Sequence, residues 1–219
     1  MRPRGGGATL TWPMHVNHKK GQVRFVIRKG DTVENPVTGE RVTFLETAAE
    51  TNGERVLIDV TVEPDGFVAA AHVHPYQSER FEIVEGTLEF KVGKETVLAG
   101  PGDVVMVEPG TLHHFRNVGE SAVRFITEVR PALGFEQFIE TMYGLAADGK
   151  TNRKGIPNPL RLAVIMRRHF DLVRLPFPPA FMQKAGLVLA APLGRLLGYQ
   201  PTYRREDSAV TAAPALESL

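Results

Sequence analysis

Residues 66–86, GFVAAAHVHPYQSERFEIVEG, place three potential metal ligands among apolar neighbours. His72 and His74 lie two residues apart in a predicted strand, 67–74. Successive side chains of a strand point to opposite faces, so we expect both imidazoles on one face. Glu79 opens the next predicted strand, and its face also carries apolar side chains. The stretch therefore predicts a partly dry site with nitrogen and oxygen ligands.

A second stretch, residues 102–117, GDVVMVEPGTLHHFRN, supplies a fourth candidate, His113. His113 shares its predicted face with Phe115, whereas His114 points the other way and is expected on the outer surface. The chain has no cysteine, so a metal site must use nitrogen and oxygen atoms.

The metal site that we predict consists of His72, His74, Glu79 and His113. Three imidazoles and one carboxylate suit one divalent transition metal such as iron, manganese, nickel, zinc, cobalt or copper. Four protein ligands leave one or two coordination positions for substrate, water or dioxygen.

The region around these residues has the pattern of an antiparallel β-structure. Short β-branched and aromatic runs alternate with turn signals such as Pro64-Asp65-Gly66 and Gly100-Pro101-Gly102-Asp103. About ten such runs at hairpin spacing predict a sandwich or barrel over residues 22–130. The predicted strands are 23–27, 41–47, 55–62, 67–74, 80–84, 87–92, 95–98, 104–107, 112–116 and 122–129.

After Pro131 the apolar residues follow helical spacing. We expect helices over 135–145 and 160–175, and a third apolar stretch over 181–197 that is interrupted by Pro192 and Gly194. Together these define a helical extension, 131–202. A flexible arm, 1–21, and a polar tail, 203–219, complete the expected organisation. Because the sequence shows neither a long apolar run nor a secretory signal, the expected location is cytoplasmic.

Charge divides the chain unevenly. Residues 1–149 carry a net charge of −6 and residues 150–205 carry +10, within a total of +1. Amphipathic helices usually dock on their own domain, so a helical cap on the barrel is the preferred interpretation of the basic section. Contact with an anionic membrane surface and a dimer interface are alternatives. No helix-turn-helix or zinc-finger signature accompanies the charge, so no nucleic-acid partner is expected.

The two histidine stretches resemble the paired motifs of the cupin superfamily. Gly66, His72, His74, Glu79 and Gly86 match every fixed position of its first motif. The second motif is matched by Gly102-Asp103 and by Pro109-Gly110, His113 and Asn117, except that Glu108 stands where the family usually has proline. The resemblance implies a jelly-roll barrel with a central divalent metal, Glu79 as a proton acceptor, and often a homodimer.

The resemblance and the four ligands favour a mononuclear metalloenzyme, dioxygenase-like, that acts on a small organic substrate. The same ligand set also serves decarboxylases, isomerases and polyketide cyclases, so the fold does not choose among them. A non-catalytic ligand- or metal-binding module is the alternative from another class. Glu46 and Glu128 are candidate pocket carboxylates, although the surface interpretation is preferred for both.

Overall fold

The computed structural model describes residues 27–205. The predicted arm, 1–21, lies outside the described residues, as do nearly all of the predicted strand 23–27 and most of the tail 203–219.

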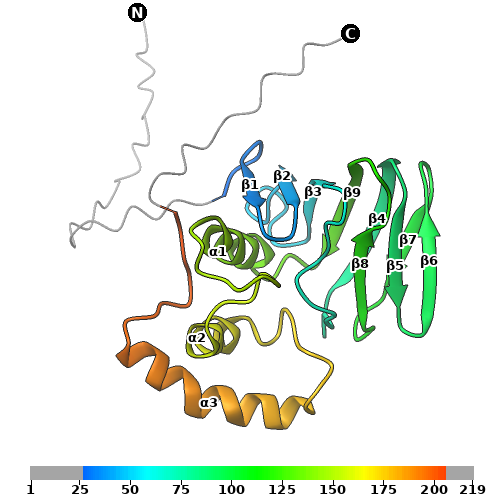
Figure 1. The fold of residues 1–219 in the computed structure, drawn as a ribbon. Helices are drawn as coiled ribbons and strands as arrows, with labels where there is room; N and C mark the ends of the chain where they lie inside the picture. The colour runs from blue at the N-terminus through cyan, green and yellow to red at the C-terminus, as the bar shows by residue number, and fades with distance from the viewer. Residues whose placement is uncertain (1–26, 206–219) are drawn as a thin grey trace, which may run out of the picture.

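Nine strands precede three helices along the chain (Figure 1). The strands are β1 Thr32–Asn35, β2 Glu40–Glu46, β3 Val56–Val62, β4 Ser78–Glu85, β5 Leu88–Val92, β6 Glu95–Ala99, β7 Val104–Val107, β8 His113–Asn117 and β9 Val123–Arg130. The helices are α1 Phe135–Ala147, α2 Pro159–His169 and α3 Ala180–Leu196.

The strands form two antiparallel sheets that face each other. One sheet has six strands in the order β1-β2-β3-β9-β4-β7, and the other has three in the order β6-β5-β8. The predicted fold class, an antiparallel jelly-roll barrel with a C-terminal helical extension, is confirmed.

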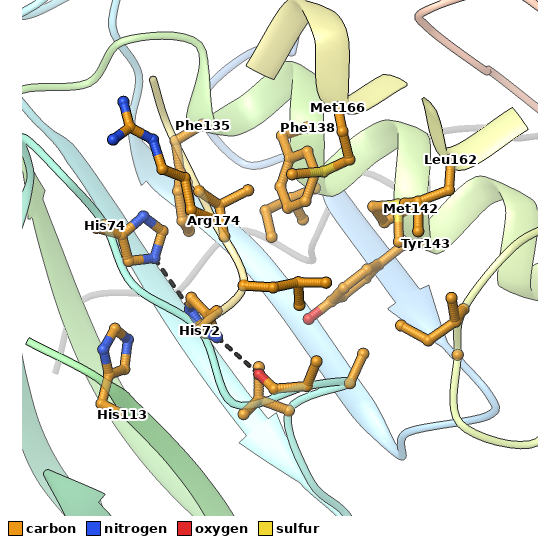
Figure 2. Close-up of a pocket in the computed structure, with 18 of the residues that line it drawn as sticks. His72, His74, His113, Phe135, Phe138, Met142, Tyr143, Leu162, Met166 and Arg174 are labelled. Atoms are coloured by element: carbon orange, nitrogen blue, oxygen red, sulfur yellow. Dashed lines mark hydrogen bonds between the residues drawn. The ribbon is translucent and has the colours of Figure 1, made fainter. Parts of the chain in front are cut away.

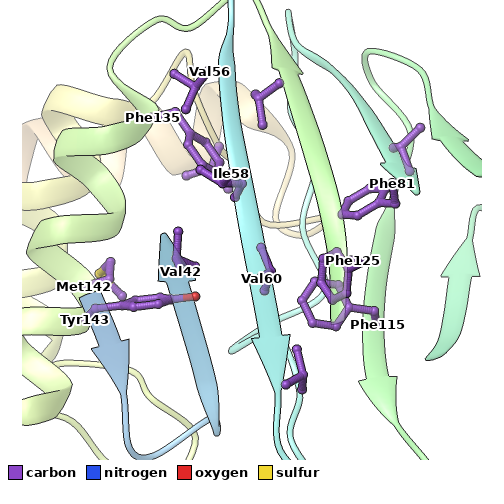
Figure 3. Close-up of a cluster of buried hydrophobic side chains, with 14 of the residues drawn as sticks. Val42, Val56, Ile58, Val60, Phe81, Phe115, Phe125, Phe135, Met142 and Tyr143 are labelled. Atoms are coloured by element: carbon purple, nitrogen blue, oxygen red, sulfur yellow. The ribbon is translucent and has the colours of Figure 1, made fainter. Parts of the chain in front are cut away.

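Strand alternation builds the core. On β3, Val56, Ile58, Val60 and Val62 are buried while the residues between them are partly exposed. Phe81, Phe90, Phe115 and Phe125 meet between the sheets, with neighbouring ring centroids 5.1–6.3 Å apart. The same core continues to α1, where Phe135, Met142 and Tyr143 approach Val42 and Ile58 (Figure 3). The barrel and the first helix thus share one apolar interior.

Helix α2 begins where the sequence supplies a start signal, whereas α3 differs from expectation. Asn158 caps α2, because its side chain accepts the Leu160 N–H at 2.9 Å and Pro159 follows it. The prediction that Pro192 and Gly194 interrupt the third helix is wrong, since α3 continues through both. Pro192 lies on the exposed side, where water can satisfy the carbonyl that loses its partner. No helix within residues 27–205 is long and apolar enough to cross a bilayer.

Two strand predictions also differ from the structure. Residues 67–74 form no continuous strand but make only isolated bridges, including His72 with His113 and Val73 with Arg174. The polar residues Thr32–Asn35 do form a strand, because they pair with β2 through four residues. In both segments tertiary pairing, not local composition, decided the outcome.

Candidate metal centre

The structure brings together the four side chains that the sequence singled out. One potential ligand atom from each of His72, His74, Glu79 and His113 lies within 4.8 Å of the other three. His72 and His74 come from the segment before β4, Glu79 from β4 and His113 from β8. His74, Glu79 and His113 are buried, while His72 is partly exposed. Figure 2 shows the three imidazoles at one end of a cavity.

Backbone carbonyl groups fix the orientation of all three imidazoles. The Nδ1 atom of His72 lies 2.8 Å from Ala70 O, that of His74 lies 2.6 Å from Leu172 O, and that of His113 lies 2.9 Å from Thr111 O. A carbonyl oxygen can only accept, so each Nδ1 must carry a proton and donate it. In the neutral imidazoles the Nε2 atoms therefore present lone pairs, the arrangement found in histidines that bind metals.

These Nε2 lone pairs face each other and the Glu79 carboxylate, so acceptors lie opposite acceptors. His72 Nε2 and His74 Nε2 are 3.0 Å apart, and Glu79 Oε2 lies 2.8 Å from His113 Nε2 and 3.6 Å from His74 Nε2. Within residues 27–205, Glu79 Oε2 and His113 Nε2 have no partner with hydrogen-bond geometry. Acceptors that face one another in a buried site are satisfied by a proton or a metal ion between them. The residues present therefore fit a metal ion.

Electrostatics in the cluster keep the carboxylate ionised. Burial alone would raise the pKa of Glu79, but the attraction of the three imidazoles outweighs it and lowers the pKa to about 2. Burial, together with repulsion from His74 and His113, lowers the pKa of His72 to about 3. Burial opposes protonation of His113 as well, yet Glu79 raises its pKa overall. The cluster thus combines a charged carboxylate with at least one neutral imidazole at neutral pH.

The turn before His113 forms although Glu108 replaces the usual proline. Thr111 N–H donates to Glu108 O at 3.1 Å, and Pro109 and Gly110 occupy the centre of the turn. Gly110 has φ +82°, a conformation that glycine adopts without strain. Gly110 N–H also donates to His74 O at 2.8 Å, which ties this turn to the histidine segment.

The helical extension takes part in the site, which sequence reasoning missed. Besides the Leu172 carbonyl that orients His74, Arg174 exchanges two backbone hydrogen bonds of 2.9 Å with Val73. The segment after α2 thus pairs with the residue between the two histidines. A contact spanning about a hundred residues, made by backbone atoms, leaves no signal in a single sequence.

A cavity of about 550 Å³ adjoins the four side chains and extends between the barrel and the helices. Its walls are mainly apolar, with Phe138 and Met142 from α1, Leu162 and Met166 from α2, and Leu187 from α3 (Figure 2). This volume is within the range of sites for small organic molecules. The helices therefore form one wall of a ligand-sized cavity beside the barrel.

A second polar group lines the same cavity and was also missed. Glu40, on β2, and Tyr143, on α1, are both 6% exposed. The Glu40 carboxyl interacts with the Tyr143 hydroxyl and accepts the Thr38 hydroxyl at 2.7 Å. Burial raises the pKa of Glu40 to about 7, although both hydrogen bonds oppose this shift. Burial and the Glu40 carboxyl raise the pKa of Tyr143 well above its ordinary value, so its hydroxyl keeps its proton.

The other candidate carboxylates do not line the cavity. Arg55 pairs with Glu46 at 2.7 Å and with Glu128 at 3.0 Å, in a partly exposed ion-pair cluster. His114 is partly exposed on β8, whereas His113 beside it is buried. Strand alternation therefore places His113 inside the barrel and leaves Glu46, Glu128 and His114 outside the cavity, as the sequence predicted.

Comparison with known families identifies the barrel. Residues 58–129 match the family model described as Cupin domain, and this span contains all four clustered side chains. The barrel belongs to the cupin superfamily. Among solved structures, a predicted oxalate decarboxylase from Thermotoga maritima is 22% identical, with TM-score 0.42, and the match covers 49% of this chain and 99% of that one.

Two curated proteins resemble the cupin region in sequence. The polyketide synthase CurC of Streptomyces cyaneus is 32% identical over 107 residues, which are 48% of this chain and 61% of that protein. The quercetin 2,3-dioxygenase of Bacillus subtilis is 28% identical over 123 residues, which are 56% of this chain and 35% of that protein. This chain thus matches less than two thirds of the length of either relative.

Proposed function

We propose that this cupin is a mononuclear metalloenzyme that acts on a small, largely apolar organic molecule in the 550 Å³ cavity, with His72, His74, Glu79 and His113 as the metal ligands. The observation that carries the proposal is the orientation of the three imidazoles, whose Nδ1 atoms all face carbonyl oxygens. This arrangement presents three Nε2 lone pairs beside a carboxylate at the cavity wall.

The class of reaction that we favour is oxygenation. A divalent metal in this ligand set supplies Lewis acidity and an open position for substrate or dioxygen. Glu79 would accept a proton from a substrate hydroxyl or carbon acid, because its carboxylate lies at the cavity wall. The resemblance to the Bacillus subtilis quercetin 2,3-dioxygenase supports this choice.

The cavity's own residues would orient the substrate. Phe138, Met142 and Met166 provide an apolar surface against which an apolar substrate would pack. The ring of Tyr143 reaches into the cavity with its hydroxyl directed toward the side where His72 lies (Figure 2). With Glu40 behind it, this hydroxyl would bind a polar group of the substrate. Replacement of Tyr143 by Phe should raise KM roughly five- to tenfold, with a smaller change in kcat.

Oxygen consumption tests the proposed reaction. Metal-reconstituted protein is assayed against aromatic and enol-type substrates, with the His74→Ala protein as the control that lacks one proposed ligand. Oxygen uptake that depends on substrate and disappears in the control supports an oxygenase. Turnover without oxygen uptake would instead assign a lyase, isomerase or cyclase.

A second candidate is a reaction in polyketide assembly that consumes no oxygen, supported by the 32% identity to the polyketide synthase CurC. It predicts conversion of a poly-β-carbonyl substrate under anaerobic conditions. If ligands bind in the cavity but no substrate is converted in either assay, the chain is a binding module and the metal has no catalytic role.

A further inference from the structure

Helix α3 presents its large apolar side chains to the solvent. Phe181 and Leu189 are each 74% exposed, and Leu196 is 84% exposed. Met182, Val188 and Leu193 are exposed by about half. At 100° per residue, these six side chains fall within an arc of about 140° on one side of the helix. The exposed face of an ordinary surface helix is polar, so α3 is reversed in this respect.

The opposite face of α3 packs against α2 without using these large side chains. It lies on α2, on the side of the helices away from the sheets (Figure 1). Small residues face α2: Ala191 is 2% exposed, and a Cβ atom at Gly194 would lie 2.5 Å from Leu160 O. Close packing through small residues leaves the large ones half or more exposed.

Basic residues lie beside this apolar face. Lys184 and Arg195 are exposed and eleven positions apart, which places them on the same flank of the helix about three turns apart. The surrounding segment, 150–205, has a net charge of +10 with Asp171 as its single acidic residue. An apolar face with a basic flank is complementary to an anionic lipid surface, where acyl chains adjoin phosphate groups.

We propose that α3 docks in the plane of an anionic membrane surface, with Phe181, Leu189 and Leu196 inserted among the acyl chains and Lys184 and Arg195 among the phosphate groups. The helix has 17 residues and a length of roughly 25 Å, and no described helix could span a bilayer, so an in-plane orientation is the one that fits. A second copy is a poorer occupant, because a symmetric contact would place two segments of charge +10 together.

Vesicle co-sedimentation of the full-length protein tests the proposal. The vesicles contain either phosphatidylcholine alone or phosphatidylcholine mixed with phosphatidylglycerol. We expect recovery with the anionic mixture, background recovery with the neutral vesicles, and loss of recovery at high salt. The double variant Phe181→Ser with Leu189→Ser should weaken partitioning by roughly tenfold per residue. Lys184→Glu with Arg195→Glu should weaken it by roughly tenfold or more.

The matched control uses exposed apolar residues elsewhere. Leu98 and Met106 on the barrel are 62% and 49% exposed, and Leu98→Ser with Met106→Ser should bind as the wild type does. Because all these positions are exposed, the variants should keep the wild-type Tm, which is measured in parallel. Background recovery of the wild type with both vesicles would overturn the proposal. A dimer without vesicle binding would also overturn it. Such a dimer would be detected by analytical ultracentrifugation, and it would be abolished by Phe181→Ser with Leu189→Ser but not by Leu98→Ser with Met106→Ser.

Discussion

Two buried glutamates line one cavity and have opposite pKa shifts. Glu79 is 5% exposed and Glu40 is 6% exposed, so burial penalises both carboxylates similarly. Yet the pKa of Glu79 is lowered to about 2, whereas that of Glu40 is raised to about 7. Imidazoles lie beside the first, whereas the second accepts hydrogen bonds from the neutral hydroxyl groups of Thr38 and Tyr143. The difference teaches that the neighbours of a buried carboxylate, not its depth, decide its charge.

The two clusters also differ in how they satisfy their polar atoms. Around Glu79, lone pairs face lone pairs, and Glu79 Oε2 and His113 Nε2 lack hydrogen-bond partners in the described part of the chain. Around Glu40, the Thr38 and Tyr143 hydroxyl groups supply donors. The first arrangement therefore suits a metal cation, which several lone pairs can bind at once, whereas the second is satisfied by a proton. Substitutions in either cluster test this difference.

The largest expected effect is loss of metal binding in His74→Ala. Removing one proposed ligand should lower metal affinity by more than roughly a hundredfold, since even substitutions of groups that only orient ligands cost 10- to 100-fold. Elemental analysis of reconstituted protein and competition with a chelating dye measure the change. His114→Ala, one residue from His113 but partly exposed, is the control and should bind metal normally. Equal metal content in both variants would show that the cluster is not a metal site.

The second effect is a change in the pH dependence of stability in Glu40→Gln. Between pH 4.5 and about 7, folded Glu40 holds a proton that the unfolded chain has released, so the free energy of unfolding falls as pH rises. A shift of this size corresponds to about 3 kcal/mol. Urea titrations of both proteins at pH 5 and pH 8 measure it. The decrease in the free energy of unfolding from pH 5 to pH 8 should be smaller in Glu40→Gln by this amount. An equal decrease in both proteins would contradict the assigned shift.

The third effect tests the extension's contact with the histidine segment. Arg174→Pro removes the N–H that donates to Val73 O at 2.9 Å. It should disturb the neighbouring Leu172 carbonyl that orients His74 and weaken metal binding roughly tenfold. Arg174→Ala keeps the backbone pairing and is the matched control. If both variants lose affinity equally, the side chain and not the pairing is responsible.

The smallest effect is expected from Thr38→Val. This change removes one hydrogen bond to the buried Glu40 carboxyl and should cost about 1 kcal/mol of stability. It should also raise the pKa of Glu40 further, because the hydroxyl favours the charged form. The stability loss should therefore be larger at pH 8 than at pH 5. An equal loss at both values would place Glu40 in one charge state throughout.

Much of the barrel could be predicted from the sequence. Period-two alternation and turn residues locate most strands, and the spacing of His72, His74, Glu79 and His113 predicts that they converge. The segment around His72 and His74 was predicted as a strand and is not one, because it pairs only at isolated positions. The two histidines converge nevertheless, since the bridges to His113 and Arg174 hold the segment extended.

The sequence by itself determined the antiparallel fold, the apolar interior and the four convergent side chains, because these follow from local periodicity and residue type. Only the tertiary structure decided that Leu172 orients His74, that Tyr143 meets Glu40, and that α3 turns its large apolar residues outward. Each of these depends on how the helical extension packs against the barrel. Such contacts join residues that are far apart in the chain, so no local periodic pattern in the sequence reveals them.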